Sequence, residues 1–87
     1  MHIRKIGIKE QIGRKIYVKH GILYHEISGM LQDDEPVFFR AQKDRYMAIG
    51  LFHRYLTVIF TLEDGQANVI TAYSSPPWQK RLHKAKK

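Results

Sequence analysis

Residues 54–73, RYLTVIFTLEDGQANVITAY, have the pattern of a long β-hairpin, around which the rest of the chain is expected to pack. Successive side chains of a strand point to opposite faces, and one face of residues 55–62 is entirely apolar: Leu56, Val58, Phe60 and Leu62. The dipeptide Asp64-Gly65 follows, and it favours the positive φ values of a type I′ turn. We therefore expect strands over 54–62 and 67–73, with one face of the pair in a hydrophobic core.

Two shorter strands are expected before this hairpin, over residues 37–40 and 45–52, with a turn at 41–44 between them. Their aromatic and β-branched content is typical of strands. Strands joined by such short turns pair antiparallel with their neighbours. The sequence from residue 37 onward therefore predicts a four-stranded antiparallel meander.

The first third of the chain has helical periodicity instead. Ile12 and Ile16 lie four residues apart and predict a helix over residues 9–20. Gly21 then stands where a helix end favours positive φ. A second helix, over 24–32, is predicted from apolar residues at i, i+4, i+7 and i+8: Leu23, Ile27, Met30 and Leu31.

The two ends complete the expected fold. Residues 3–8 are β-branched and fit either an edge strand or a lead-in to the first helix. Residues 78–87 predict a short basic helix, because Pro77 is tolerated in a first helical turn, with 80–87 as a frayed basic tail. We expect one α+β domain over residues 1–87, with N-terminal helices packed on a twisted four-stranded antiparallel sheet and a short basic C-terminal helix.

Positive charge is concentrated near the two ends of the chain. The formal net charge is +7, and most basic residues fall in two blocks: Arg4, Lys5, Lys9, Arg14, Lys15 and Lys19, then Lys80, Arg81, Lys84, Lys86 and Lys87. A fold that brings these blocks to one side would present a basic face to a phosphate backbone. A charged, solvated surface is the alternative interpretation. On the first interpretation the residues expected to bind nucleic acid are Arg14, Lys15, Lys80, Arg81 and Lys84.

Several kinds of site are excluded by what the sequence lacks. It has no cysteine for a disulfide or a thiolate metal site, and its histidines do not have zinc-motif spacing. A Gly-rich phosphate loop and a GxSxG motif are also missing, so we expect no metal and no cofactor. No apolar run reaches the roughly 20 residues of a membrane span, and the N-terminus does not read as a secretory signal. We expect a cytoplasmic protein without membrane contact.

The residue types that remain suit metal-independent RNA cleavage. Attack by a 2′-hydroxyl needs a proton acceptor, departure of the 5′-oxygen needs a donor, and the charge that develops on the phosphate must be stabilised. Side chains able to do this stand at the ends of the expected elements: Lys19, His20, Arg45, Arg54 and Tyr73. Each also has a structural interpretation, helix capping for the histidine and solvated edge charge for the arginines.

Five segments, taken in order, resemble the BrnT toxins, which are similar in turn to the wider RelE-like group. The segments are KHGI at 19–22, RYMAIG at 45–50, RYLTVIF at 54–60 with VITAY at 69–73, and KRL at 80–82. The resemblance spans roughly residues 14–82 and depends on the order and spacing of the segments. The ITAY ending of the last strand is also similar to a broader group of uncharacterised RelE-like domains.

The resemblance implies a RelE-like ribonuclease fold and an endoribonuclease toxin of a type II toxin–antitoxin pair. The resemblance also implies mRNA as the substrate, free or on the ribosome, and an antitoxin with the DNA-binding function as the protein partner. DNA would then be bound only through the antitoxin. The family's basic site carries over to Lys19, His20, Arg45 and Arg54. The sequence departs from the family pattern in four respects. Tyr73 replaces an arginine, His83 replaces a tyrosine in the last helix, Leu23 replaces the hydroxyl N-cap of the second helix, and the family's early Trp-Asp is not visible.

The leading hypothesis from the sequence is therefore a ribonuclease with His20 as acid or base. Lys19, Arg45 and Arg54 would bind phosphate, and Tyr73 would transfer a second proton or stack on a base. The alternative is a non-catalytic module that binds RNA or a partner on the same fold. A DNA-binding regulator is disfavoured because no helix-turn-helix or ribbon pattern is present.

Overall fold

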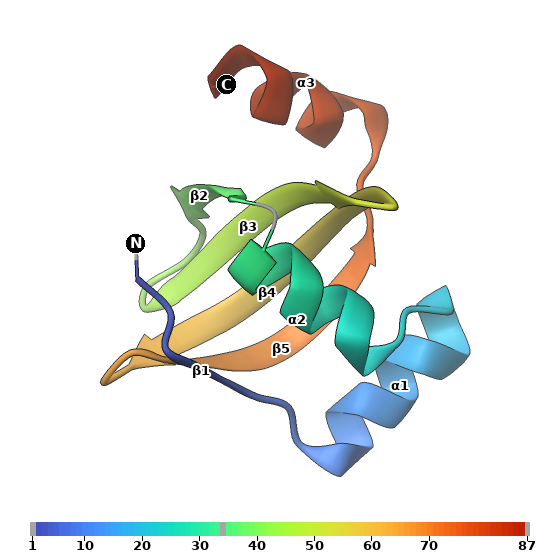
Figure 1. Cartoon of the computed structure of the whole chain (residues 1–87), viewed down its shortest axis with the longest axis vertical. Coiled ribbons are helices and arrows are strands. Elements are labelled where there is room, and N and C mark those ends of the chain that lie inside the picture. Colours follow the sequence, from blue (N-terminus) through green and yellow to red (C-terminus); the bar gives the residue numbers. More distant parts are fainter. Residues whose placement is uncertain (1, 34, 87) are drawn as a thin grey trace.

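The computed structural model describes residues 2–33 and 35–86, which form two N-terminal helices, a sheet and a C-terminal helix (Figure 1). The elements are β1 (Lys5–Gly7), α1 (Glu10–His20), α2 (Tyr24–Asp33), β2 (Val37–Arg40), β3 (Arg45–Phe52), β4 (Arg54–Glu63), β5 (Gln66–Ser74) and α3 (Pro77–Lys86). The predicted helices and the four strands from residue 37 onward are confirmed within one or two residues. So is the hairpin turn, because Asp64 and Gly65 have φ values of 50° and 81°.

The sheet has five strands in the order β1-β5-β4-β3-β2, so the predicted four-stranded antiparallel sheet is wrong in number and in type. The additional strand, β1, pairs parallel with β5, placing Lys5 opposite Gln66 and Gly7 opposite Asn68. The other three pairings are antiparallel. A three-residue strand is too short to show a period of its own, and its partner lies some 60 residues further along the chain.

The helices lie on both faces of the sheet. On one face Leu56, Val58 and Phe60 are fully buried in a core that includes Ile16 of α1 and Ile27 of α2. The neighbouring residues of β4 face the other way, and there α3 covers the sheet. Figure 1 shows α1 and α2 together and α3 apart from them. Burial of each large core side chain stabilises the fold by about 1.5–3 kcal/mol.

A β-bulge divides β5 into two halves. Ile59 pairs with Thr71 while Phe60 pairs with Val69, so the register skips Ile70. The buried residues of β5 are accordingly Ala67, Val69 and Ala72, with a step of two and then of three. As a result, Gln66 and Asn68 before the bulge share a sheet face with Thr71 and Tyr73 after it.

Three further details differ from the sequence-based expectation. The segment expected as a frayed tail is helical to Lys86, because Gln79 and His83 are buried against the sheet; Lys87 lies outside the described residues. Leu23, expected in the buried stripe of the second helix, precedes α2 and is exposed. Gly29 departs from the general rule that a glycine inside a helix only weakens it, because a Cβ there would clash with the Phe52 ring.

Candidate active site

His20 and Tyr73 meet at the open edge of the sheet. His20 is the last residue of α1, and Gly21, with φ of 65°, ends the helix and donates its N–H to the Tyr17 carbonyl. Tyr73 stands near the end of β5, beyond the part of that strand that β1 covers. The two ring centroids lie 6.3 Å apart, with the rings tilted by 50°. The exposed histidine and the half-buried tyrosine are therefore near enough to act on one ligand.

The Tyr73 hydroxyl is held by a buried polar network beneath α3. Gln79, 2% exposed, donates from Nε2 to the Tyr73 oxygen at 3.0 Å. Its Oε1 accepts a hydrogen bond from the Thr57 hydroxyl, which is 2.7 Å from the hydroxyl of Ser75. Because Gln79 donates to the phenolic oxygen, the hydroxyl proton of Tyr73 can be donated to a ligand. Thr57, Ser75 and Gln79 were not predicted from the sequence.

Two lysines and His20 line a small cavity between α1 and β5. The cavity has a volume of about 160 Å³, and Ile70 and Thr71 form its strand side. Lys15 and Lys19 reach it from successive turns of α1, since residues four apart share a helix face. The partial negative charge at the C-terminal end of α1 is offset by Lys19, which stands in the last turn of the helix. An anion in this cavity would face three basic side chains.

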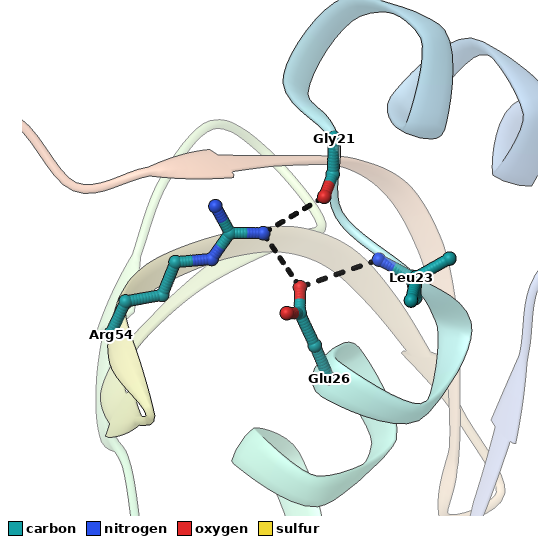
Figure 2. A network of polar contacts seen from close by, with 4 residues as sticks. All are labelled: Gly21, Leu23, Glu26 and Arg54. Atoms are coloured by element: carbon teal, nitrogen blue, oxygen red, sulfur yellow. Dashed lines mark hydrogen bonds and ion pairs between the residues drawn. The ribbon is translucent and has the colours of Figure 1, made fainter.

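Arg54 clamps the chain segment that follows His20 (Figure 2). Its Nη2 donates to the Gly21 carbonyl at 2.9 Å and forms an ion pair with Glu26 at 2.7 Å. The Leu23 N–H also donates to Glu26, at 3.3 Å. Figure 2 shows the other terminal nitrogen of Arg54 pointing away from both partners. Arg54 thus fixes the turn between α1 and α2, and its binding of phosphate stays a prediction.

The carboxyl group of Glu26 is tuned by these contacts. Burial raises its pKa, but the hydrogen bonds from Arg54 and the Leu23 N–H, with the charges of Arg54 and His25, outweigh burial. The pKa of Glu26 is therefore held below its ordinary value of 4.5. A charged carboxylate here keeps Arg54 in place, which the sequence pattern did not indicate.

Arg45 is not brought to His20. It pairs with Thr61 on β3–β4, whereas Tyr73 pairs with Thr57, four residues away along β4. That separation is about 13 Å along the strand. Arg45 is exposed and lies on the same face of the sheet as Tyr73. Its expected phosphate contact would therefore involve a different phosphate from the one near His20.

The remaining predicted RNA-binding residues lie around the site. Lys80, Arg81 and Lys84 are exposed on α3, and Lys80 Nζ lies 5.8 Å from the centroid of the Tyr55 ring. Arg14 forms an exposed ion pair with Glu10 at 3.3 Å and lines a groove along α1 that shares Lys15 and Lys19 with the cavity beside His20. Of this group, the structure places only Lys15 in the cavity beside His20.

His83, which departs from the family pattern, is part of the packing between α3 and the sheet. It is 6% exposed, and its ring meets that of Tyr55 edge-on at 5.3 Å.

Within residues 2–33 and 35–86, no group of three His, Asp or Glu side chains is arranged to hold a metal ion. In the same residues, no helix is long and apolar enough to cross a membrane.

No protein-family model and no curated protein sequence matches the chain. Among solved structures it matches the 1.1 Å crystal structure of the Brucella abortus ribonuclease toxin BrnT, with a TM-score of 0.70 and 27% sequence identity. The match covers 83% of this chain and 96% of the toxin. The fold is BrnT-like. The resemblance found in the sequence is thus confirmed at the level of the fold, with two N-terminal helices, a five-stranded mixed sheet and a C-terminal helix.

Proposed function

We propose that this chain is a metal-independent endoribonuclease toxin, controlled by a cognate antitoxin. The observation that carries the proposal is the His20–Tyr73 pair beside the cavity lined by Lys15 and Lys19, on a BrnT-like ribonuclease fold. A proton acceptor, a proton donor and fixed positive charge are the three requirements of RNA cleavage by an internal nucleophile.

In this mechanism His20 accepts the proton of a ribose 2′-hydroxyl, whose oxygen attacks the adjacent phosphorus. The bond from phosphorus to the 5′-oxygen breaks as Tyr73 donates its proton to that oxygen. The products are a 2′,3′-cyclic phosphate and a free 5′-hydroxyl. Gln79 favours proton donation by Tyr73. Its side-chain N–H donates a hydrogen bond to the phenolic oxygen, which leaves the phenolic proton available to the substrate.

The basic residues stabilise and position the substrate. Lys15 and Lys19 face the phosphate that gains charge during attack. Arg45 is suited to a phosphate further along the strand, and Lys80, Arg81 and Lys84 to the RNA on the α3 side. Arg54 acts by holding Gly21, and through it the position of His20. The substrate we propose is single-stranded mRNA in the cytoplasm, whether free or on the ribosome.

The deciding experiment is RNA cleavage in EDTA by the wild-type protein and by His20→Ala and Tyr73→Phe variants. We expect EDTA-resistant cleavage that leaves 2′,3′-cyclic phosphate ends, and a loss of rate of about 100-fold or more in each variant. His2→Ala is the matched control, because His2 is exposed and lies near the Asp64-Gly65 turn, at the opposite end of β5 from Tyr73. It should cleave as the wild type does.

If the wild-type protein binds RNA without cutting it, the proposed ribonuclease activity is refuted and the alternative of a non-catalytic binding module is supported. Cleavage that survives His20→Ala would refute the assigned site. The toxin role is tested by expression in bacteria. Wild type should arrest growth, His20→Ala should not, and co-expression of a small protein encoded next to the toxin gene should restore growth.

A further inference from the structure

A larger groove continues from the cavity beside His20 along the same edge of the sheet. It has a volume of about 540 Å³ and runs between the start of α1, β1 and β5. Ile12 and Ile70 line both the groove and the cavity, so the two spaces adjoin. A strand of RNA whose phosphate lies beside His20 would therefore enter this groove with its neighbouring nucleotide.

The walls of the groove combine an apolar surface, polar side chains and one cation. Ile8, Ile12 and Ile70 supply flat apolar contact for a base or a ribose. Gln66, Asn68 and Thr61 supply hydrogen-bonding groups, and Lys9 is the charged residue of the lining. Apolar stacking with a few polar groups and a nearby cation is the pattern by which proteins bind single-stranded RNA.

The amides of Gln66 and Asn68 form a prearranged pair. Gln66 Nε2 donates to Asn68 Oδ1 at 2.7 Å. This bond leaves the Gln66 carbonyl oxygen as an acceptor beside the Asn68 amino group as a donor. One acceptor next to one donor is complementary to the Watson–Crick edge of a base, which carries the same two functions side by side.

Gly7 and the β-bulge hold this amide pair in the groove. Gly7 pairs with Asn68 in the β1–β5 ladder, and a Cβ there would lie 2.6 Å from Gln66 Nε2 and 2.9 Å from Asn68 Oδ1. A side chain at position 7 would therefore displace the two amides from this arrangement. The bulge at Ile70 then keeps the amides on the sheet face that carries Tyr73.

We propose that the groove is a nucleotide subsite that reads the base next to the cleaved bond of a single-stranded RNA. Gln66 and Asn68 bind the base edge, the isoleucines pack against the base or its ribose, and Lys9 binds a phosphate. This inference rests on the proposed ribonuclease function, because it takes its occupant from the same RNA strand. Apart from the charge of Lys9, no motif or charge pattern in the sequence points to this groove.

The test measures binding separately from cleavage. The probes are 2′-O-methyl RNA hexamers of A, C, G or U, which lack the nucleophile and stay intact. Wild type should prefer one base, and a Gln66→Leu/Asn68→Leu variant should lose about tenfold in affinity for that hexamer and bind all four alike. Lys9→Gln should weaken all four equally and reduce the slope of log affinity against log salt by about 0.7.

Gln42→Leu and Lys43→Gln are the matched controls, an amide and a lysine in the β2–β3 turn at the opposite edge of the sheet. They should bind all hexamers as the wild type does. Thermal unfolding establishes that each variant is folded, and Lys9→Gln, at an exposed position, tests the subsite even if the amide variant unfolds.

Two patterns of result separate this inference from the proposed function. If the groove variants bind and discriminate bases as the wild type does, the subsite is refuted, whatever the cleavage assay gives. Suppose instead that the wild type does not cleave RNA, whereas the groove variants lose affinity and base preference. Base recognition by the groove is then supported, and the proposed ribonuclease activity is refuted.

Discussion

At the scale of single residues, the site depends on how Tyr73 is held. A tyrosine at the end of a strand ordinarily has freedom to turn toward solvent, but Gln79 fixes the phenolic oxygen from beneath α3 at 3.0 Å. The glutamine is itself fixed by Thr57, which is fully buried. A polar network with its members satisfied is rigid. The tyrosine is therefore positioned by residues that never reach the substrate.

We predict that Gln79→Leu lowers kcat about tenfold with little change in KM, since one hydrogen bond of about 1.4 kcal/mol is lost at the proton donor. In a Tyr73→Phe background the same substitution should cost nothing further, because the hydroxyl through which it acts is gone. Steady-state kinetics of the wild type, the two single variants and the double variant measure the coupling between Gln79 and Tyr73 directly.

Ser75→Ala is the control for general loosening of this network. It removes the bond between Ser75 and Thr57 at 2.7 Å but leaves the Gln79–Tyr73 bond intact. We expect a loss of about 1 kcal/mol in the free energy of unfolding, with kcat unchanged. Additive kinetic losses for Gln79→Leu and Tyr73→Phe would instead show that Gln79 acts only through stability.

At the scale of elements, the ion pair of Arg54 and Glu26 joins β4 to the turn between α1 and α2. The pair lies only partly in solvent, with side-chain exposures of 40% for Arg54 and 16% for Glu26. Because Arg54 also binds the Gly21 carbonyl, a loss of this pair frees the residue next to His20. Stability and activity should therefore respond together.

We predict that this pair makes the protein acid-sensitive. The pKa of Glu26 lies below its ordinary 4.5 in the folded state, so the carboxylate stabilises the fold above that value. Its contribution is lost as pH falls through the lower, folded pKa. The free energy of unfolding should therefore drop more steeply between about pH 5 and pH 3 in wild type than in Glu26→Gln.

Denaturant titrations across this pH range measure the effect. At neutral pH Glu26→Gln should reduce the free energy of unfolding by about 1 kcal/mol, since solvent partly screens a pair whose Arg54 side chain is 40% exposed. Glu10→Gln is the matched control, because it breaks the exposed Glu10–Arg14 pair of α1 and should change stability very little. Equal pH profiles for wild type and Glu26→Gln would contradict the prediction.

For the molecule as a whole, the individual helices and strands could be predicted from the sequence better than the contacts between residues far apart in the chain. The period of residues 54–62 and the Asp64-Gly65 turn predicted the central hairpin, because both signals are local. The parallel strand β1 was left open as one of two alternatives, since its partner is remote. The bulge at Ile70 and the contact between Gln79 and Tyr73 have no local pattern at all.

The candidate site follows the same division. His20 and Tyr73 were recognised as residue types at element ends, and the structure brings them together. Arg54 and Arg45 were recognised in the same way, but the first holds the backbone of Gly21 and the second lies far along the sheet. Chemical type is visible in a sequence, whereas the partner that a charged group takes up depends on the folded chain.

The charge at the two ends of the chain leads to a last prediction. His20 ends α1, Gln79 belongs to α3, and Tyr73 contacts both, so the two basic helices flank one site from opposite sides of β5. RNA that passes through this site should meet Lys19 on one side and Lys80 on the other.

Each phosphate contact on a single strand contributes about 0.7 to the slope of log affinity against log salt. Lys19→Gln and Lys80→Gln should therefore each reduce the slope by about 0.7, and the double variant by the sum, while Lys43→Gln leaves it unchanged. A slope that responds to Lys19 but not to Lys80 would mean that the strand leaves the site without crossing α3, and that the charge of the C-terminal helix serves another purpose.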